Sequence, residues 1–243
     1  MFITSCFRTY INHDQTSSSI PIAKLTTATM AISVLPAQDE DMLRLFTITS
    51  LAFKDNEPFW DAMYPDHHTE EGRKNGAERF VKIRNTDPHT HFMKAVDDQT
   101  GEIMGFSKWN IYKNHIPPPP GALDERYWST ADEKDYTEAM IIEFLKDRNA
   151  HIEATKGNVV NLDLLVIDPK YQRQGVGAKL VEWGCAQADE LGFEAIVESS
   201  VFGRGLYLKH GFKFQKDVVM KAPEKWAHKP KCKYAWLTRE KKT

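Results

Sequence analysis

The sequence predicts a mixed α/β fold of the α+β kind, in which one sheet of six or seven strands is flanked by about five helices. Short apolar runs alternate with amphipathic stretches from residue 32 onward. Two of these runs, 91–96 and 103–112, are separated only by the turn-forming segment 97–101, which predicts an antiparallel hairpin. A strand, a helix and a second strand between residues 159 and 199 predict a right-handed crossover between parallel strands.

The first part of the chain predicts one strand and two helices. Residues 32–36 have the composition of a short strand, and Asp39 can cap a helix that follows. A second helix is expected over residues 69–83. The helix after Asp39 has apolar residues at helical spacing, namely Met42, Leu45, Phe46, Thr49 and Ala52.

The second part of the chain predicts the remaining elements. A central strand is expected at 159–167, a helix at 178–191 and a buried strand at 194–199. A short helix over 201–210 contains Gly203 and Gly205, each of which costs roughly 1 kcal/mol in a helix interior. The last two strands are expected at 214–220 and 234–237.

Composition excludes several functional classes. Among the 243 residues, 41% are apolar and the net charge is −2, so the chain can bury a core and has no basic field for nucleic acid. No apolar run approaches the length of a membrane span. Cys6, Cys185 and Cys232 are too widely spaced for a disulfide framework or a zinc site, which favours a reducing, cytoplasmic location and no metal.

The amino-terminal residues 1–30 differ from the rest. They are rich in Ser and Thr, with Arg8 and Lys24 as basic residues, so we expect a disordered extension. An organelle-targeting segment is the alternative interpretation. Residues 31–240 are then expected to form a single domain.

A glycine-containing loop at residues 172–178 is the strongest functional signal. It follows a strand and the break at Asp168-Pro169, and it opens a helix. This arrangement directs backbone N–H groups and the positive end of a helix dipole at one point, which suits a phosphate group. A dinucleotide fingerprint would need glycine at Leu180, and a P-loop would need lysine at Ala178. Neither alternative is therefore supported.

Two motifs resemble the GNAT superfamily of acyl-CoA-dependent N-acyltransferases. The pattern Gln172-x-x-Gly175-x-Gly177 is similar to its motif A, and Tyr207-x-x-x-Gly211-Phe212 is similar to a downstream segment of that family. The resemblance is strongest over residues 159–220 and extends to about 32–240. It implies the GNAT fold, in which two central strands splay apart and hold the donor between them.

The resemblance implies acetyl-CoA as the acyl donor and a set of donor-binding residues. The strand 164–166 would pair through its main chain with the pantetheine arm, and the loop would hold the pyrophosphate. The expected donor-binding residues are Leu164, Leu165, Val166, Gln172, Arg173, Gln174, Gly175, Val176, Gly177 and Ala178.

The resemblance also implies catalytic roles. Tyr207 is expected to act as the general acid toward the CoA thiolate. The usual acidic position falls on Asn161, so the general base is expected to be Asp163 or Glu198. For each of these residues a purely structural role in the core is the alternative, and an exposed amine needs no dedicated base.

The acceptor side is less defined. Phe59, Trp60, Tyr64 and Trp109 are expected to line it, since aromatic rings attract ammonium groups. Residues 113–157 interrupt the fold after Pro117–Pro120 and contain a helix over about 132–148, so we expect an insertion that forms a wall of the acceptor site or packs at the side.

The functional prediction is an acetyl-CoA-dependent N-acetyltransferase that acts on a primary amine by direct transfer in a ternary complex. The sequence favours a small molecule as the acceptor. A homodimer is possible, as in many relatives. A catalytically idle acyl-CoA-binding sensor or scaffold is the alternative from another class, and a longer acyl chain is the alternative donor.

Overall fold

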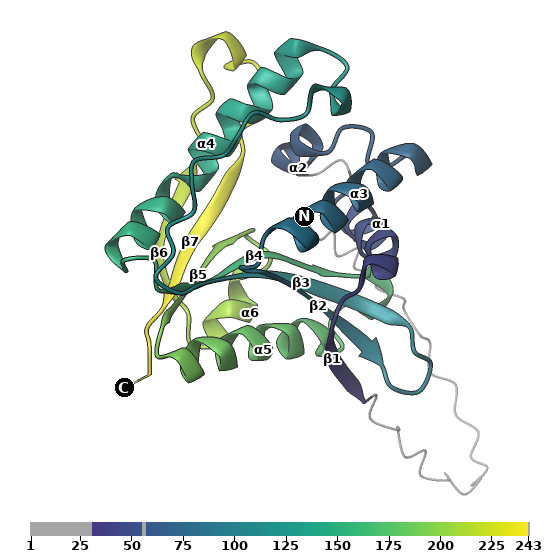
Figure 1. The fold of residues 1–243 in the computed structure, drawn as a ribbon, viewed down its shortest axis with the longest axis vertical. Helices are drawn as coiled ribbons and strands as arrows, with labels where there is room; N and C mark the ends of the chain where they lie inside the picture. The colour runs from purple at the N-terminus through teal and green to yellow at the C-terminus, as the bar shows by residue number, and fades with distance from the viewer. Residues whose placement is uncertain (1–30, 55–56, 243) are drawn as a thin grey trace, which may run out of the picture.

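Seven strands form one sheet in the computed structural model, which describes residues 31–54 and 57–242. Their order across the sheet is β1-β2-β3-β4-β5-β7-β6, and β4 and β5 run parallel while the other neighbours pair antiparallel (Figure 1). The mixed fold is as predicted, and the seven strands agree with the six or seven that the sequence predicts. The strands are β1 (Ile32–Pro36), β2 (Thr90–Asp97), β3 (Ile103–Tyr112), β4 (Val159–Ile167), β5 (Glu194–Ser199), β6 (Lys213–Val219) and β7 (Lys233–Arg239).

Six α-helices lie in the described part of the chain. The short helix α2 was not expected from the sequence; it begins at Pro58, which suits the first turn of a helix. Helix α6 is shorter than the predicted 201–210 because it begins only after Gly203. The helices are α1 (Met42–Phe53), α2 (Pro58–Met63), α3 (Glu70–Thr86), α4 (Ala131–Ala154), α5 (Val176–Leu191) and α6 (Arg204–Lys209).

The helices cover both faces of the sheet. Helices α5 and α6 lie on one face, and α1, α3 and α4 lie on the other (Figure 1). On the α5 face, Trp109 of β3 is fully buried beneath Gly184 of α5. A Cβ atom at Gly184 would lie only 2.2 Å from the Trp109 ring, so glycine is what allows this helix to approach the sheet.

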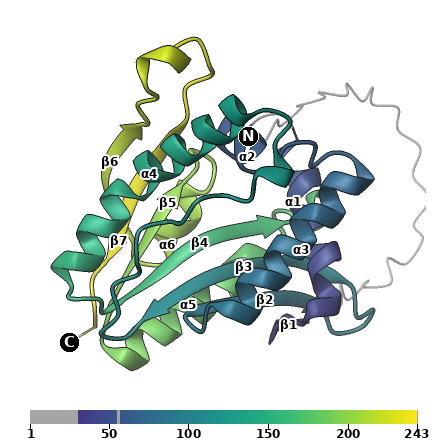
Figure 2. The same ribbon diagram turned by 45° about the horizontal axis from the view of Figure 1, so that its top comes forward.

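Helix α4 lies within residues 113–157, the segment expected to be an insertion, and is longer than predicted. A capping box between Thr130 and Glu133 starts it, and it continues for 24 residues to Ala154 because Ile152 in its last turns is fully buried. It packs across β5 and β7, where Met140 and Ile152 share a core cluster with Trp236 (Figure 2). Helix α4 is therefore an integral layer of the fold.

Strands β4 and β5 diverge partway along their length. They pair from Val159–Leu162 against Glu194–Val197, but β4 continues to Ile167 with only β3 beside it. At the point of divergence β4 contains a bulge: Trp109 pairs with Leu162 and Lys108 with Leu164, so Asp163 is the extra residue. The splay that the family resemblance implied is present.

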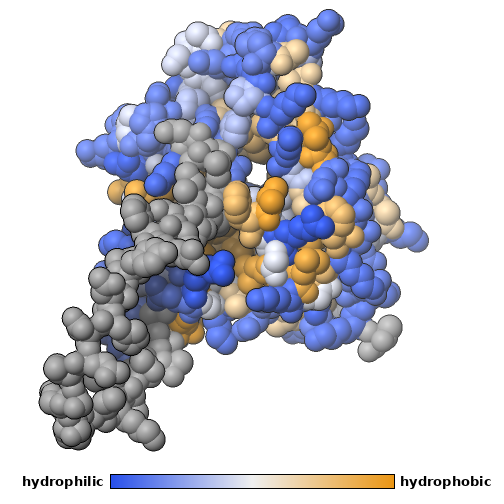
Figure 3. Space-filling view, turned by 180° about the vertical axis from the view of Figure 1, so that it is seen from behind, coloured by the Kyte–Doolittle hydropathy of each residue, from blue (hydrophilic) through white to orange (hydrophobic). Residues whose placement is uncertain are grey.

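On the face shown in Figure 3, hydrophilic side chains predominate, and hydrophobic side chains form small groups between them. The expected extension at residues 1–30, including Cys6, lies outside the described residues. No helix in residues 31–54 and 57–242 has the length and apolar character needed to cross a membrane.

Candidate acyl-donor and acceptor site

The loop before α5 is built to bind an anion. Arg173 and Gly175 both have left-handed backbone conformations, with φ values of 64° and 88°. Lys179 is the first residue of α5 whose N–H donates to a backbone carbonyl, that of Gly175. The N–H groups of residues 173–178 have no hydrogen-bond partner among the described residues, so several free donors and the helix dipole converge there.

The loop is held in place by its own side chains. Gln172 donates from Nε2 to the carbonyl of Ile167 at the end of β4, and Gln174 donates to the carbonyl of Lys170. Gly177 lies in the first turn of α5, where a Cβ atom would lie 3.2 Å from Leu206 of α6. The predicted donor-binding loop is therefore positioned against the ends of β4 and α6.

The expected pantetheine strand has one free edge. Leu164, Leu165 and Val166 pair with β3 on one side, and no strand pairs with them on the other side after the divergence from β5. Their side chains alternate between the two core layers, with Val166 buried on the α1 face. Main-chain groups on the free edge can thus pair with an extended ligand.

Tyr207 lies at the carboxyl end of β5, in helix α6. Its ring is buried and packs edge-on against Phe212, with ring centroids 5.8 Å apart. A Cβ atom at Gly203 would lie 3.0 Å from the Tyr207 ring, so the glycine that shortens the helix also makes room for this ring. The hydroxyl has no hydrogen-bond partner among the described residues, and burial raises the pKa of the phenol above its ordinary value.

Asp163 and Glu198 are joined by an arginine from helix α4. Arg148 donates from Nε and Nη2 to both carboxylate oxygens of Glu198, at 2.9 and 2.7 Å, and from Nη1 to Asp163 Oδ1. Lys108 of β3 donates from Nζ to Asp163 Oδ2 at 2.7 Å. We call these four residues the Arg148 quartet; it contains two carboxylates and two cations.

The quartet sets the pKa values of its two acids in opposite directions. Burial alone would raise the pKa of Asp163, but Lys108 and Arg148 together hold it well below its usual range. Burial raises the pKa of Glu198 above its usual value, and Arg148 opposes that shift. Because Asp163 is a weak base and the side chain of Glu198 is only 1% exposed, this arrangement does not favour either as the general base expected from the sequence.

The usual acidic position holds a structural amide. Asn161 is fully buried in β4 and donates from Nδ2 to Asn110 Oδ1 at 3.4 Å. Its own Oδ1 has no partner among the described residues. Asn110 in turn donates to Thr90 at 2.6 Å, so this part of the sheet carries a neutral polar network.

The four aromatic residues expected at the acceptor side occupy different places. Phe59 packs against Phe144 of α4, with ring centroids 4.7 Å apart, and is the only one of the four on the boundary between α2 and α4. Trp60 and Tyr64 are buried and stack on each other at 4.3 Å, and Arg79 covers the Tyr64 ring at 3.9 Å. The expectation for Trp109 does not hold, because it is fully buried on the α5 face beneath Gly184.

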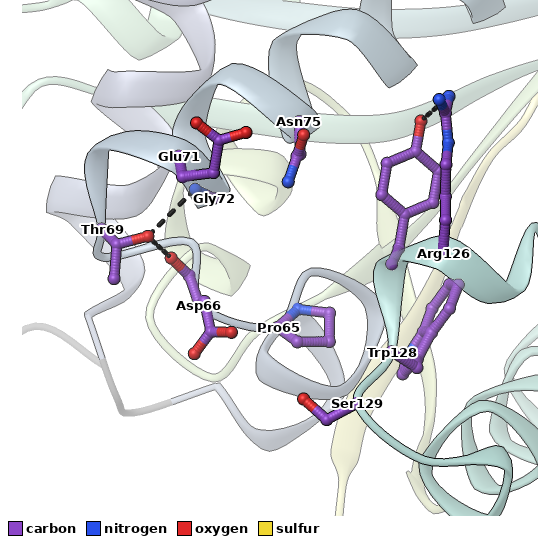
Figure 4. A pocket seen from close by; sticks show the side chains of 10 residues that line it. Pro65, Asp66, Thr69, Glu71, Gly72, Asn75, Arg126, Trp128 and Ser129 are labelled. Atoms are coloured by element: carbon purple, nitrogen blue, oxygen red, sulfur yellow. Dashed lines mark hydrogen bonds between the residues drawn. The ribbon is translucent and has the colours of Figure 1, made fainter.

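A cavity of about 300 Å³ lies away from these residues. It is formed by the loop before α3, the first turn of α3 and residues 126–129 (Figure 4). Carboxylates of Asp66 and Glu71 and the indole of Trp128 line it, together with Arg126. None of the site residues expected from the sequence lines this cavity.

Sequence reasoning missed Arg148 and Lys108. Arg148 lies among polar residues of a helix and Lys108 in an alternating strand, so neither stands out in the sequence. Only the folded arrangement brings them to Asp163. Within the described residues, no group of three or more His, Cys, Asp or Glu side chains is arranged to hold a metal ion.

Comparisons with solved structures identify the same fold in proteins named as acetyltransferases or as similar to them. A Drosophila melanogaster polyamine N-acetyltransferase that forms N-acetylagmatine has a TM-score of 0.58 at 13% identity, covering 86% of this chain and 100% of that chain. A mosquito arylalkylamine N-acetyltransferase-like protein has a TM-score of 0.56 at 14% identity, with coverages of 86% and 99%. A Sinorhizobium meliloti phosphinothricin acetyltransferase in complex with acetyl-CoA has a TM-score of 0.50 at 15% identity, with coverages of 87% and 89%.

These identities are low enough that the structural likeness establishes the fold alone. A search of curated protein sequences found no significant match. The family model described as "Acetyltransferase (GNAT) family" matches residues 52–212, which is more than half of the chain and includes both motifs. The chain therefore belongs to the Acetyltransferase (GNAT) family.

Proposed function

We propose that this protein is an acetyl-CoA-dependent N-acetyltransferase that moves an acetyl group directly to the primary amine of a small molecule. The observation that carries this proposal is the free row of N–H groups at residues 173–178, placed next to the unpaired edge of β4. An anion site and an open strand edge at one end of the sheet suit the pyrophosphate and the amide-containing arm of coenzyme A.

The residues that would hold the donor are those of the loop 172–178 and the strand segment 164–166. The donor supplies an acetyl group activated as a thioester. The loop binds negative charge through its N–H groups, and the exposed Arg173 adds a positive charge beside them. The free edge of β4 aligns the extended arm with the strand.

Tyr207 is proposed as the general acid. Its raised pKa keeps the proton on Oη at neutral pH, and Oη is then able to give that proton to the leaving thiolate. The unpartnered hydroxyl supports this role, because a purely structural tyrosine with its ring in the core would be expected to satisfy its hydroxyl locally.

Direct transfer fits the chemistry of the described cysteines better than a covalent intermediate does. Cys185 lies against the sheet in α5, and burial raises the pKa of its thiol. Burial likewise raises the pKa of Cys232 to about 11. Neither thiol is an activated nucleophile at neutral pH.

No carboxylate of the Arg148 quartet is proposed as a general base. Asp163 and Glu198 both remain engaged by Arg148, so the amine loses its proton to water before attack. The two solved structures named for acting on arylalkylamines and on agmatine support a small amine as acceptor. We further propose that residues 31–240 act as one domain in the cytoplasm, with 113–157 as the insertion.

One observation favours a second candidate, an idle domain that only binds acyl-CoA. A buried amide, Asn161, occupies the position where many family members carry an acid. The two candidates differ in turnover: an enzyme releases free thiol when an amine is added, whereas a sensor domain binds the donor without consuming it.

Thermal unfolding with ligands tests the donor site. Acetyl-CoA at about 100 times its dissociation constant should stabilise the fold by about 2.7 kcal/mol, and free CoA should do the same. NAD at the same concentration should give no shift. Equal shifts for NAD and acetyl-CoA, or no shift with millimolar acetyl-CoA, would contradict the assignment of the loop.

A further inference from the structure

The ion pair between Lys108 and Asp163 is the part of the quartet in which another cation could replace the lysine. The side chains of Lys108 and Asp163 are 15% and 21% exposed, whereas those of Arg148 and Glu198 are 6% and 1% exposed. Arg148 is fixed by three hydrogen bonds to two carboxylates. Lys108 makes a single contact, through the end of a long flexible stem.

The contact lies where an acceptor has to arrive. Asp163 is the bulged residue of β4 and the first residue past its last paired position with β5, at Leu162. The donor-binding edge of β4, residues 164–166, begins immediately after it. An amine held at Asp163 is therefore next to the strand proposed to align the thioester.

Building on the proposed function, we propose that the Lys108 ammonium is an internal stand-in for the substrate, and that an acceptor alkylammonium binds by displacing it from Asp163 Oδ2. Asp163 is then the residue that anchors the acceptor, and Lys108 is a competitor that lowers the apparent affinity. The acceptor class that follows is a primary alkylamine that arrives with its ammonium at the end of an unbranched aliphatic chain, as the lysine side chain does.

Charge balance supports this exchange. The quartet has two negative and two positive groups in a mostly buried setting. Replacing one ammonium with another conserves that balance, and the freed Lys108 moves its charge into solvent. A neutral or anionic acceptor would leave Asp163 without one of its two partners, which is costly away from water.

Direct binding of n-pentylamine to the CoA-saturated protein, measured by calorimetry, tests the inference without requiring turnover. In Lys108→Met the competitor is absent while Arg148 remains on the other oxygen of Asp163. We expect the dissociation constant for n-pentylamine to fall about fivefold, since a partly exposed ion pair stabilises the closed form by roughly 1 kcal/mol. In Lys108→Arg the guanidinium can still pair with Asp163, and it can do so through two hydrogen bonds. The binding of n-pentylamine should therefore weaken.

A matched control is available in the same sheet. Lys94 of β2 donates to Asp41 at 2.7 Å, with side chains 19% and 11% exposed, which closely resembles the Lys108–Asp163 pair. Lys94→Met should leave the affinity for n-pentylamine unchanged. The uncharged isostere n-pentanol should not bind measurably to any variant.

The outcomes separate this inference from the proposed function. Tighter amine binding in Lys108→Met without any turnover would support the displacement and contradict the acetyltransferase proposal. Unchanged or weaker binding in Lys108→Met would overturn the displacement even if the protein acetylates amines. If Lys108→Met does not fold, unchanged binding in Lys108→Arg, or equal binding of n-pentanol, overturns it instead.

Discussion

Replacing Arg148 with methionine removes the cation that joins Asp163 and Glu198. Methionine fills much of the same space but donates no hydrogen bonds. Three hydrogen bonds are lost, and Glu198 is left buried without a counter-charge. Lys108 remains on Asp163, so the uncompensated charge falls mainly on Glu198.

The structure sets the size of the effect. Removing one partner from a buried ion pair costs about 3–5 kcal/mol. For a chain of about this size each kcal/mol shifts the melting temperature by roughly 2–4 °C, so a loss of about 4 kcal/mol should lower it by about 8–16 °C. Adding Glu198→Gln to the variant should recover part of this loss, because the buried charge disappears.

The pH dependence of this loss has a definite sign. Burial raises the folded-state pKa of Glu198, and Arg148→Met removes the main interaction that opposes that shift. A group with a raised folded pKa contributes stability that is present below its unfolded value, near 4.5, and is lost as the pH rises through the folded pKa. The deficit of Arg148→Met relative to the native protein should therefore be larger at pH 8 than at pH 5.

Thermal unfolding at these two pH values, followed by circular dichroism, measures both effects. Arg126→Met is the control, because Arg126 is largely exposed and pairs with Asp124 at the surface; its melting temperature should not change measurably. A shift in Arg148→Met as small as that of Arg126→Met, or a deficit that shrinks as the pH rises, would refute the reasoning.

Three further predictions concern the reaction. Tyr207→Phe should lower kcat about 100-fold or more while the dissociation constant for CoA and the melting temperature stay unchanged, since the lost hydroxyl has no protein partner; an unchanged kcat would remove Tyr207 from the mechanism. Gly175→Ala should weaken CoA binding, whereas Gly192→Ala should not. Gly192 is a matched control because both glycines have positive φ and open space for a Cβ, so the two variants bear a similar backbone strain of about 1 kcal/mol. Equal CoA affinity in the two variants would contradict the loop assignment. The value of kcat/KM for a primary amine should rise with pH up to the pKa of that amine, because neither Asp163 nor Glu198 is available as a base; a plateau reached near neutral pH would point to a dedicated base.

Much of the fold could be predicted because the signals are local. Apolar runs of four to ten residues bounded by turn formers located all seven strands, and the glycines near Tyr207 correctly indicated a short α6. The short helix α2 was missed because its six residues carry no periodic pattern and its aromatic residues resemble a loop. The end of α4 was placed too early because its last turns are stabilised by burial of Ile152, a tertiary contact.

The site residues that local sequence marks could also be predicted, and those assembled by long-range contacts could not. The anion-binding loop depends on backbone geometry that a sequence motif encodes directly, so its residues were found. The Arg148 quartet depends on long-range pairing between β3, α4, β4 and β5, and nothing in the sequence around Arg148 marks it. Trp109 was misplaced because an alternating strand pattern does not reveal which face lies under α5.

The most direct test of the central claim is to incubate the purified protein with acetyl-CoA and a panel of primary alkylamines and arylalkylamines, following both thiol release and the mass of the amine. We expect thiol release that depends on the amine, with one acetyl group added to the amine for each thiol formed. Donor binding without amine-dependent thiol release across the whole panel would contradict the enzyme assignment and leave the acyl-CoA-binding domain as the function of this fold.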